Sequence, residues 1–148
     1  MNWICKHFND LSVTELYAIL RLRVEVFCIE QNCIYQDIDN KDQTAYHLMG
    51  MIDDKLVAYA RILPASISYD EPSIGRVVTS ASYRRSGIGK ELMKRSIEKC
   101  IELFETKQIK IGAQLYLKNF YESLGFVQTS DVYLEDGIEH IEMVLTLK

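Results

Sequence analysis

The sequence predicts an α/β (α+β) protein with a mixed central sheet and helices on both faces. Strand-like and helix-like runs alternate in the order β-α-β-β-β-α-β-α-β-β. Residues 56–63 are apolar on both faces, which is typical of a strand covered by layers on either side. Only two prolines and no Gly- or Ser-rich linker occur in the 148 residues, so we expect one domain over 1–148.

The first elements are expected to be a strand, a helix and a long loop. Trp3 to Phe8 predict the strand. Ser12-Val13-Thr14-Glu15 has the pattern of a capping box, and apolar residues at helical spacing extend the helix to about Ile29. Residues 30–43 are polar and acidic, and a long ordered loop of this kind is often functional.

The rest of the chain predicts strands paired by turns and two further helices. Asp53-Asp54 and Glu135-Asp136-Gly137 read as hairpin turns, and Gly125 reads as a left-handed helix cap. The expected elements are strands at 46–52, 55–63 and 74–79, a helix at 87–104, a strand at 109–113, a helix at 116–124 and two closing strands around 135–137.

The overall composition is that of an ordinary globular protein. Hydrophobic residues make up 48% and charged residues 26% of the chain. The formal net charge of −4 argues against nucleic acid as the main partner, because phosphate binding favours a basic excess. The start of the chain lacks the apolar core of a signal peptide, and no run is long enough to cross a membrane. We therefore expect a cytoplasmic protein that does not bind membranes.

The four cysteines are scattered along the chain. They are expected to be reduced thiols in an intracellular protein. Cys28 and Cys33 lack close zinc-ligand spacing, and no second Cys/His pair completes a set. We expect no bound metal.

The segment Arg84-Arg85-Ser86-Gly87-Ile88-Gly89-Lys90 connects a predicted strand to a predicted helix. A helix start has unpaired backbone N–H groups and the positive end of the helix dipole. Glycines let a bulky anion approach that backbone, and the basic side chains add charge. Such a segment suits a pyrophosphate.

Three alternatives compete with this interpretation. A dinucleotide fingerprint needs a third glycine where Leu92 stands, and a Walker loop needs Ser or Thr where Glu91 follows the lysine. A plain helix start with flexible glycines and surface charge stays open on this segment alone.

Three further segments give this one a family resemblance. Together with Phe120-Tyr121-Glu122-Ser123-Leu124-Gly125-Phe126, the Arg84–Gly89 segment resembles the GNAT superfamily of N-acetyltransferases. The likeness to motifs A and B of that family spans about 74–126, and the order of elements agrees over the whole chain. The segment 26–39 and Gly112-Ala113-Gln114 further resemble the ElaA-type GNAT proteins of bacteria. The resemblance implies the GNAT acyl-CoA N-acyltransferase fold, with acetyl-CoA as co-substrate.

The resemblance also implies roles for the donor half of the reaction. The backbone of Val77, Val78 and Thr79 would pair with the pantetheine arm, and the Val78 amide would donate to the thioester oxygen. Amides from Arg85 to Lys90 would hold the pyrophosphate. Tyr121 stands where many members keep the tyrosine that protonates the departing thiolate; a core aromatic is the alternative. Many members have an asparagine where this chain has Gln114, whose longer amide would have to make the same contact.

The acceptor half rests on scattered polar residues. His140 lies opposite the apolar face of its strand and is a candidate base, or simply a solvent-facing histidine. His47 shares a strand face with methionines and is either a substrate-binding or a buried, hydrogen-bonded histidine. Glu30 and Asp39, with the other carboxylates of the 30–43 loop, would attract a cationic amine or act as base, unless they only face water.

Arg61 and Arg76 interrupt apolar strands. A buried arginine is costly without a partner, so we expect ion pairs with the acidic loop. The functional alternative is a bidentate clamp for a carboxylate on the acceptor.

These observations together favour an N-acetyltransferase acting on a primary amine of a small molecule or peptide. A non-catalytic CoA-binding regulatory module and an acyltransferase with a longer acyl donor are the alternatives. A strongly basic patch for an acidic carrier protein is not visible. An exposed sheet edge would allow a homodimer.

Overall fold

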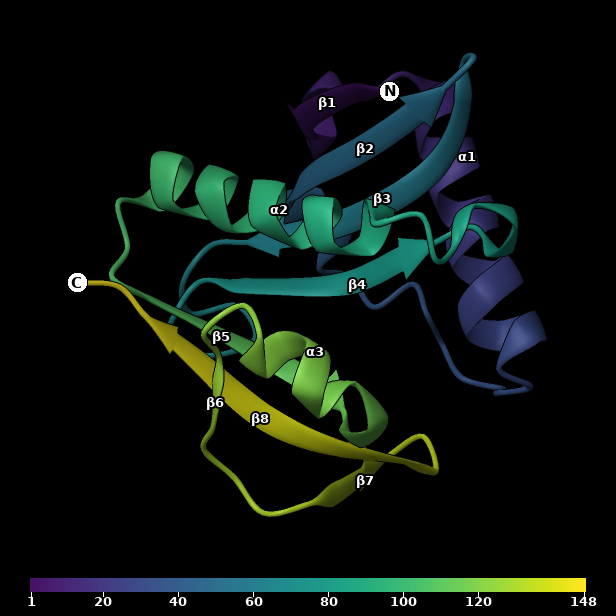
Figure 1. Cartoon of the computed structure of the whole chain (residues 1–148). Coiled ribbons are helices and arrows are strands. Elements are labelled where there is room, and N and C mark those ends of the chain that lie inside the picture. The colour runs from purple at the N-terminus through teal and green to yellow at the C-terminus, as the bar shows by residue number, and fades with distance from the viewer.

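One mixed sheet of eight strands runs through the molecule (Figure 1). The computed structural model describes residues 1–148. The strand order is β1-β2-β3-β4-β5-β8-β6, with β7 paired to β8, and β4 with β5 is the parallel pair. The strands are β1 (Asn2–His7), β2 (Tyr46–Ile52), β3 (Lys55–Leu63), β4 (Ser73–Thr79), β5 (Gln108–Gln114), β6 (Val127–Gln128), β7 (Tyr133–Glu135) and β8 (Ile138–Thr146). The predicted mixed sheet is confirmed; the two-residue strand β6 was not predicted.

Helices cover both faces of this sheet, as predicted. In Figure 1, α2 and α3 lie on the near face while α1 lies behind the sheet. The helical elements are α1 (Val13–Arg23), the π-helix η2 (Val24–Glu30), α2 (Ile88–Phe104), α3 (Lys118–Glu122) and the short 3-10 turns η1 (Phe8–Asp10), η3 (Asp42–Thr44), η4 (Ala81–Tyr83) and η5 (Leu115–Leu117). The helix expected at 116–124 is thus split between η5 and α3.

Two apolar clusters, one on each face, hold the layers together. The larger packs Leu92, Met93 and Cys100 of α2 against buried residues of β3, β4, β5 and β8. The smaller packs α1 and η2 against Met49, Tyr59 and Val78. Because strand side chains alternate between faces, one set of strands serves both clusters. This explains why β3 is apolar on both faces.

The first helix begins where the sequence predicts and changes form before it ends. The Ser12 hydroxyl accepts from the Glu15 N–H at 3.0 Å, and the Glu15 carboxylate accepts from the Ser12 N–H at 2.8 Å. From Val24 the helix widens to a π-helix, which the sequence did not predict. Cys33 N–H then donates to Cys28 O at 3.0 Å, five residues back. Short π-helical segments often occur at functional sites.

The turns behave as their residues predict. Asp53 and Asp54 have φ of 49° and 60°, which matches a tight hairpin turn. Gly125 has φ of 100° after α3 and Gly137 has φ of 78° in the β7–β8 turn.

No helix of the structure has the length and apolar character that a bilayer span requires.

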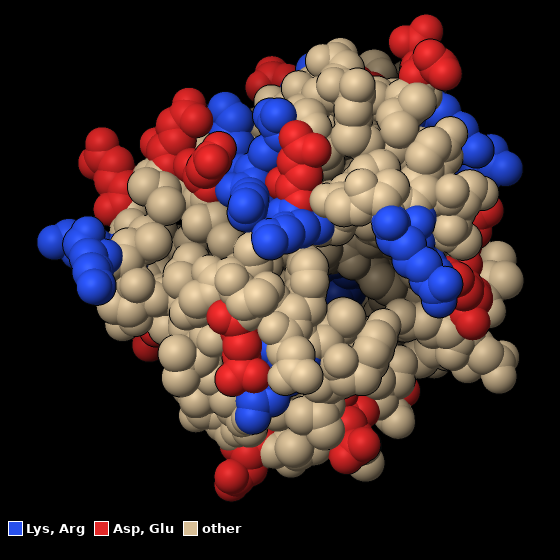
Figure 2. Space-filling model, viewed as in Figure 1, with Lys and Arg blue, Asp and Glu red and all other residues tan.

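The sheet opens between β4 and β5. These parallel strands pair at Ser73 and Lys110 only, near their beginnings, and then diverge (Figure 1). The second half of β4 therefore has no strand partner on this side. Figure 2 shows a hollow in the molecular surface between α2 and α3, with a basic side chain at its bottom. The opening separates β4 from β5 and β8.

Candidate active site

The open edge of β4 presents backbone groups that lack a strand partner. Ser80 N–H donates to Val57 O at 2.8 Å, and Val78 lies opposite Tyr59, so these residues face β3. In an antiparallel ladder successive residues face opposite sides. The N–H groups of Val77 and Thr79 therefore face the opening. This geometry moves the candidate oxyanion donor from Val78 to Val77.

A β-bulge lies immediately before this open edge. Gly75 pairs with Arg61 and Val78 pairs with Tyr59, so Arg76 and Val77 together oppose Ala60. Arg76 has φ of 50°. The extra residue changes the direction of the strand and of the peptide groups that follow it.

The turn before α2 offers a row of free amides. Gly87 (φ 82°) and Arg85 (φ 66°) adopt left-handed conformations that turn the chain into the helix. The first N–H of α2 bonded to the preceding turn is that of Glu91, to Gly87 O at 3.1 Å. The N–H groups from Arg85 to Lys90 form no hydrogen bond within the chain. Unpaired donors at a helix N-terminus fit a pyrophosphate.

The basic side chains around this turn are not equivalent. Arg84 forms a two-pronged ion pair with Glu30 at the end of η2, and its Nε donates to Thr79 O at 3.2 Å. The Arg84 hydrogen bond lowers the pKa of Glu30. Arg85 and Lys90 are exposed and form no ion pair. The structure thus joins Glu30, expected on the acceptor side, to the donor turn.

Tyr121 lies in α3 beside the opening. Its side chain is 7% exposed and packs edge-on against Phe120 and Phe126. Its hydroxyl has no hydrogen-bond partner within the chain. Burial, with a contribution from Tyr116, raises the pKa of Tyr121 to about 12. The phenol is therefore protonated at neutral pH and has a proton to give.

Gln114, the last residue of β5, contacts the residue that follows the π-helix η2. Its amide Nε2 donates to Gln31 Oε1 at 3.3 Å. Nearby, the Cys33 thiol donates to Asp136 O at 3.5 Å. These two contacts join the segment after η2 to β5 and to the β7–β8 turn, across the opening.

His140 is the third residue of β8 and pairs with Gln114 of β5. Its Nδ1 lies 2.7 Å from Ile138 O, a carbonyl that only accepts, so Nδ1 carries a proton. Nε2 is the other ring nitrogen, and it lies 3.4 Å from Glu135 Oε2. The ring stacks on Tyr133. A histidine held in one tautomer beside a carboxylate is suited to accept a proton.

His47 occupies a different environment. Its ring is fully buried, with the Tyr59 hydroxyl donating to Nδ1 at 2.6 Å and Nε2 donating to Asp42 O at 3.0 Å. Burial lowers the pKa of His47, which keeps the ring neutral. Both nitrogens are occupied, so the structure leaves His47 none to offer a substrate.

The acidic loop meets three arginines in what we term the Arg–Asp cluster. Arg23 and Arg61 are almost fully buried, while Arg76 and Asp39 form its exposed edge at 22% and 21% exposure of the side chain. Asp42 bridges Arg23 (2.8 Å) and Arg61 (3.0 Å). The ion pairs expected for Arg61 and Arg76 are confirmed. The cluster comprises Arg23, Arg61, Arg76, Asp37, Asp39 and Asp42, and its formal charges cancel.

The arginines of the cluster stabilise the ionised form of Asp39. Burial alone would raise the pKa of Asp39, but hydrogen bonds and charge from Arg61, with the charge of Arg76, lower it to about 2.

Arg23 is a member of this cluster that the sequence did not single out. Arg23 lies at helical spacing with Leu16, Leu20 and Phe27. This position indicates a buried ion pair, because an arginine on an apolar helix face needs a buried partner.

Two tyrosines near β5 were also missed. A Cβ at Gly112 would lie 2.8 Å from the Tyr69 hydroxyl and 3.2 Å from the Tyr133 hydroxyl, so the missing side chain leaves room for both phenols. Lys110 lies over the Tyr69 ring at 5.0 Å. Together with His140 stacked on Tyr133, these groups form a polar cluster along β5 and β8.

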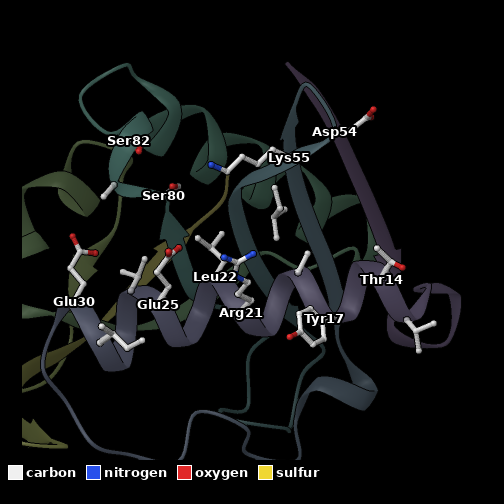
Figure 3. Close-up of a pocket in the computed structure, with 16 residues that line it drawn as sticks. Thr14, Tyr17, Arg21, Leu22, Glu25, Glu30, Asp54, Lys55, Ser80 and Ser82 are labelled. Carbon is white, nitrogen blue, oxygen red and sulfur yellow. The ribbon is translucent and has the colours of Figure 1, made fainter.

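A separate groove of about 870 Å³ runs along α1 and η2, opposite Ser80 and Ser82 (Figure 3). Its lining is apolar along Leu22 and Val26, with Tyr17 and Arg21 at the surface. Neither Tyr121 nor His140 lines it. The groove therefore lies apart from the candidate acid and base.

No group of three or more His, Cys, Asp or Glu side chains is placed to hold a metal ion.

Comparisons with known proteins agree with this fold. The model of the acetyltransferase (GNAT) domain matches residues 11–147. The protein ElaA of Escherichia coli is 46% identical over 145 residues, covering 97% of this chain and 95% of ElaA. A protein of the yeast Schizosaccharomyces pombe is 42% identical, covering 99% and 98%, so similar chains are not restricted to bacteria. The crystal structure of an acyl-CoA N-acyltransferase from Pseudomonas aeruginosa superposes with a TM-score of 0.93 at 41% identity, covering 99% and 100%.

Proposed function

This chain belongs to the GNAT acetyltransferase family, and we propose that it transfers an acetyl group from acetyl-CoA to a primary amine of a small molecule or peptide. One observation carries the proposal: the free backbone edge of β4 leads directly into the free amides of the turn before α2. An acyl-CoA has both a pantetheine arm that pairs like a strand and a pyrophosphate that needs such amides.

The donor half uses mainly backbone groups. Val77 and Thr79 would pair with the pantetheine arm, and amides from Arg85 to Lys90 would hold the pyrophosphate. Arg85 and Lys90 add positive charge from the surface. Gln114 would contact the arm from the β5 side. When bound, acetyl-CoA supplies an acetyl thioester that an amine can attack.

The chemistry then needs an oxyanion donor, an acid and a base. The Val77 N–H would donate to the thioester oxygen as negative charge builds there. Tyr121 would protonate the departing thiolate, because its hydroxyl is protonated and has no other partner. His140 Nε2 would accept the proton of the attacking ammonium, directly or through water, with Glu135 beside it.

The acceptor would lie on the β5–β8 side of the opening. Asp39 and Arg76 form the exposed edge of the Arg–Asp cluster and are the members within reach of a substrate. The Nη1 group of Arg76 has no partner within the chain, so it has a hydrogen bond to offer an acceptor carboxylate.

The test measures binding first and turnover second. Saturating acetyl-CoA should raise the melting temperature, since a ligand of the native state raises apparent stability. Release of CoA thiol is then measured against a panel of primary amines and short peptides. No stabilisation by acetyl-CoA would overturn the donor assignment. Stabilisation without turnover would favour a non-catalytic CoA-binding module, and faster turnover with longer acyl-CoAs would favour a different donor.

A further inference from the structure

We propose that Asp37, Asp39 and Tyr35 are positioning residues that act through Arg76 to fix the orientation of the Val77 N–H. The inference rests on the proposed function, in which that N–H is the oxyanion donor. It assigns to the acidic loop a role in catalysis that does not require contact with either substrate.

The peptide group between Arg76 and Val77 contains the Val77 N–H, so the conformation of Arg76 directly sets where this N–H points. Arg76 has φ of 50°, which an arginine rarely adopts without other interactions to hold it. On the β5 side the strand has no partner that could fix this peptide. On the other side, β3 pairs with Gly75 and Val78 and leaves Arg76 and Val77 without a direct partner, so the side chain of Arg76 is the group that can hold this peptide.

The side chain of Arg76 supplies that hold. Its Nη2 donates to Asp37 O at 3.1 Å and to Asp39 Oδ2 at 3.2 Å. Its Nε lies 2.8 Å from Asp37 Oδ1, an ion-pair contact. The guanidinium lies over the Tyr35 ring at 5.7 Å. Four contacts from one loop thus fix a side chain whose own backbone is strained.

The loop side of this contact is itself anchored. The Asp37 side chain is 3% exposed, and its Oδ2 accepts from Arg23 Nε at 2.8 Å. The Tyr35 hydroxyl donates to Asp37 Oδ1 at 3.0 Å. Asp37 is therefore a rigid link between α1 and the bulge of β4. A displacement of about 1 Å in a reacting group can cost a hundredfold in rate, so such rigidity matters.

The experiment measures the hydrogen bond to the thioester oxygen of bound acetyl-CoA, and it needs no amine substrate. Acetyl-CoA carrying ¹³C at the thioester carbonyl is bound to the protein, and its C=O stretch is measured by isotope-edited infrared spectroscopy. A hydrogen bond to the oxygen weakens the C=O bond and lowers this frequency. We expect a lower frequency with the wild type than in free solution, and loss of most of this shift in Asp37→Asn.

The matched control is Asp42→Asn. Asp42 is also a buried carboxylate of the Arg–Asp cluster and also pairs with Arg23, but it does not contact Arg76. It should lose comparable stability and keep the wild-type carbonyl frequency. With an amine found to be acetylated, Asp37→Asn should lower kcat about ten- to a hundredfold with acetyl-CoA affinity unchanged.

Arg76→Lys is the second variant, since it keeps the charge at the exposed edge of the cluster if Asp37→Asn does not fold. It should lose the same carbonyl shift. Retention of the shift in a folded Asp37→Asn or Arg76→Lys variant, or equal loss in Asp42→Asn, would overturn the inference alone. Bound acetyl-CoA with no shift in the wild type would overturn the oxyanion donor of the proposed function, and this inference with it.

Discussion

Replacement of Tyr121 by phenylalanine removes one oxygen from the candidate active site. We expect kcat to fall about ten- to a thousandfold, the usual effect of losing one acid–base group. This fall corresponds to about 1.4 to 4 kcal/mol of lost transition-state stabilisation. The hydroxyl makes no hydrogen bond within the chain and the residue is 7% exposed, so the free energy of unfolding should change by less than about 1 kcal/mol. Affinity for acetyl-CoA should stay the same.

The assay follows CoA thiol release at saturating acetyl-CoA, with binding checked by thermal shift. Because burial raises the pKa of Tyr121 to about 12, the phenol stays protonated between about pH 6 and 9. The variant should therefore lose rate equally across this range and keep the shape of the wild-type profile. Unchanged kcat, or a loss that appears only in acetyl-CoA affinity, would refute the acid role.

Three further predictions concern the surroundings of the site. Glu30→Gln should tighten acetyl-CoA binding about three- to tenfold by calorimetry, because it releases Arg84 and removes a negative charge near the pyrophosphate turn. Asp39, whose pKa falls from 3.8 to about 2 on folding, should contribute about 2 kcal/mol of stability above pH 4, lost as the pH falls through about 2. Urea unfolding of Asp39→Asn should lack this part of the acid dependence. Gly112→Ala should raise the acceptor KM and cost about 1–3 kcal/mol in urea unfolding, because its Cβ would meet the Tyr69 hydroxyl at 2.8 Å.

The donor half of the site was largely predictable because it depends on local sequence. The residues from Arg84 to Lys90 form their turn through neighbours in the chain, and glycine at 87 matches the left-handed conformation found there. The strand, turn and helix that carry these groups were all expected, as were the capping box at Ser12 and the cap at Gly125. Which β4 amides face the opening depends on the bulge at Arg76, and the family resemblance, carried over to this sequence, had implied Val78 instead of Val77.

The rest of the site was less predictable because it is made by contacts between distant segments. The pairs Glu30–Arg84 and Gln31–Gln114 join residues 54 and 83 positions apart. A π-helix replaces the last turns of the first helix, and apolar periodicity does not separate the two forms. The space that Gly112 leaves for two phenols likewise appears only when three segments are brought together.

The Arg–Asp cluster changes what the acidic loop can do. From the sequence alone, one expectation was that its carboxylates attract a cationic amine. In the structure Asp37, Asp39 and Asp42 face three arginines, and the formal charges cancel, so the cluster exerts little net pull on a cation. Glu135 is different, since its side chain is 58% exposed and lies 3.4 Å from His140 Nε2. In the proposed function, the β7–β8 hairpin would therefore attract the ammonium and remove its proton, while the loop at 30–43 would hold the bulge of β4.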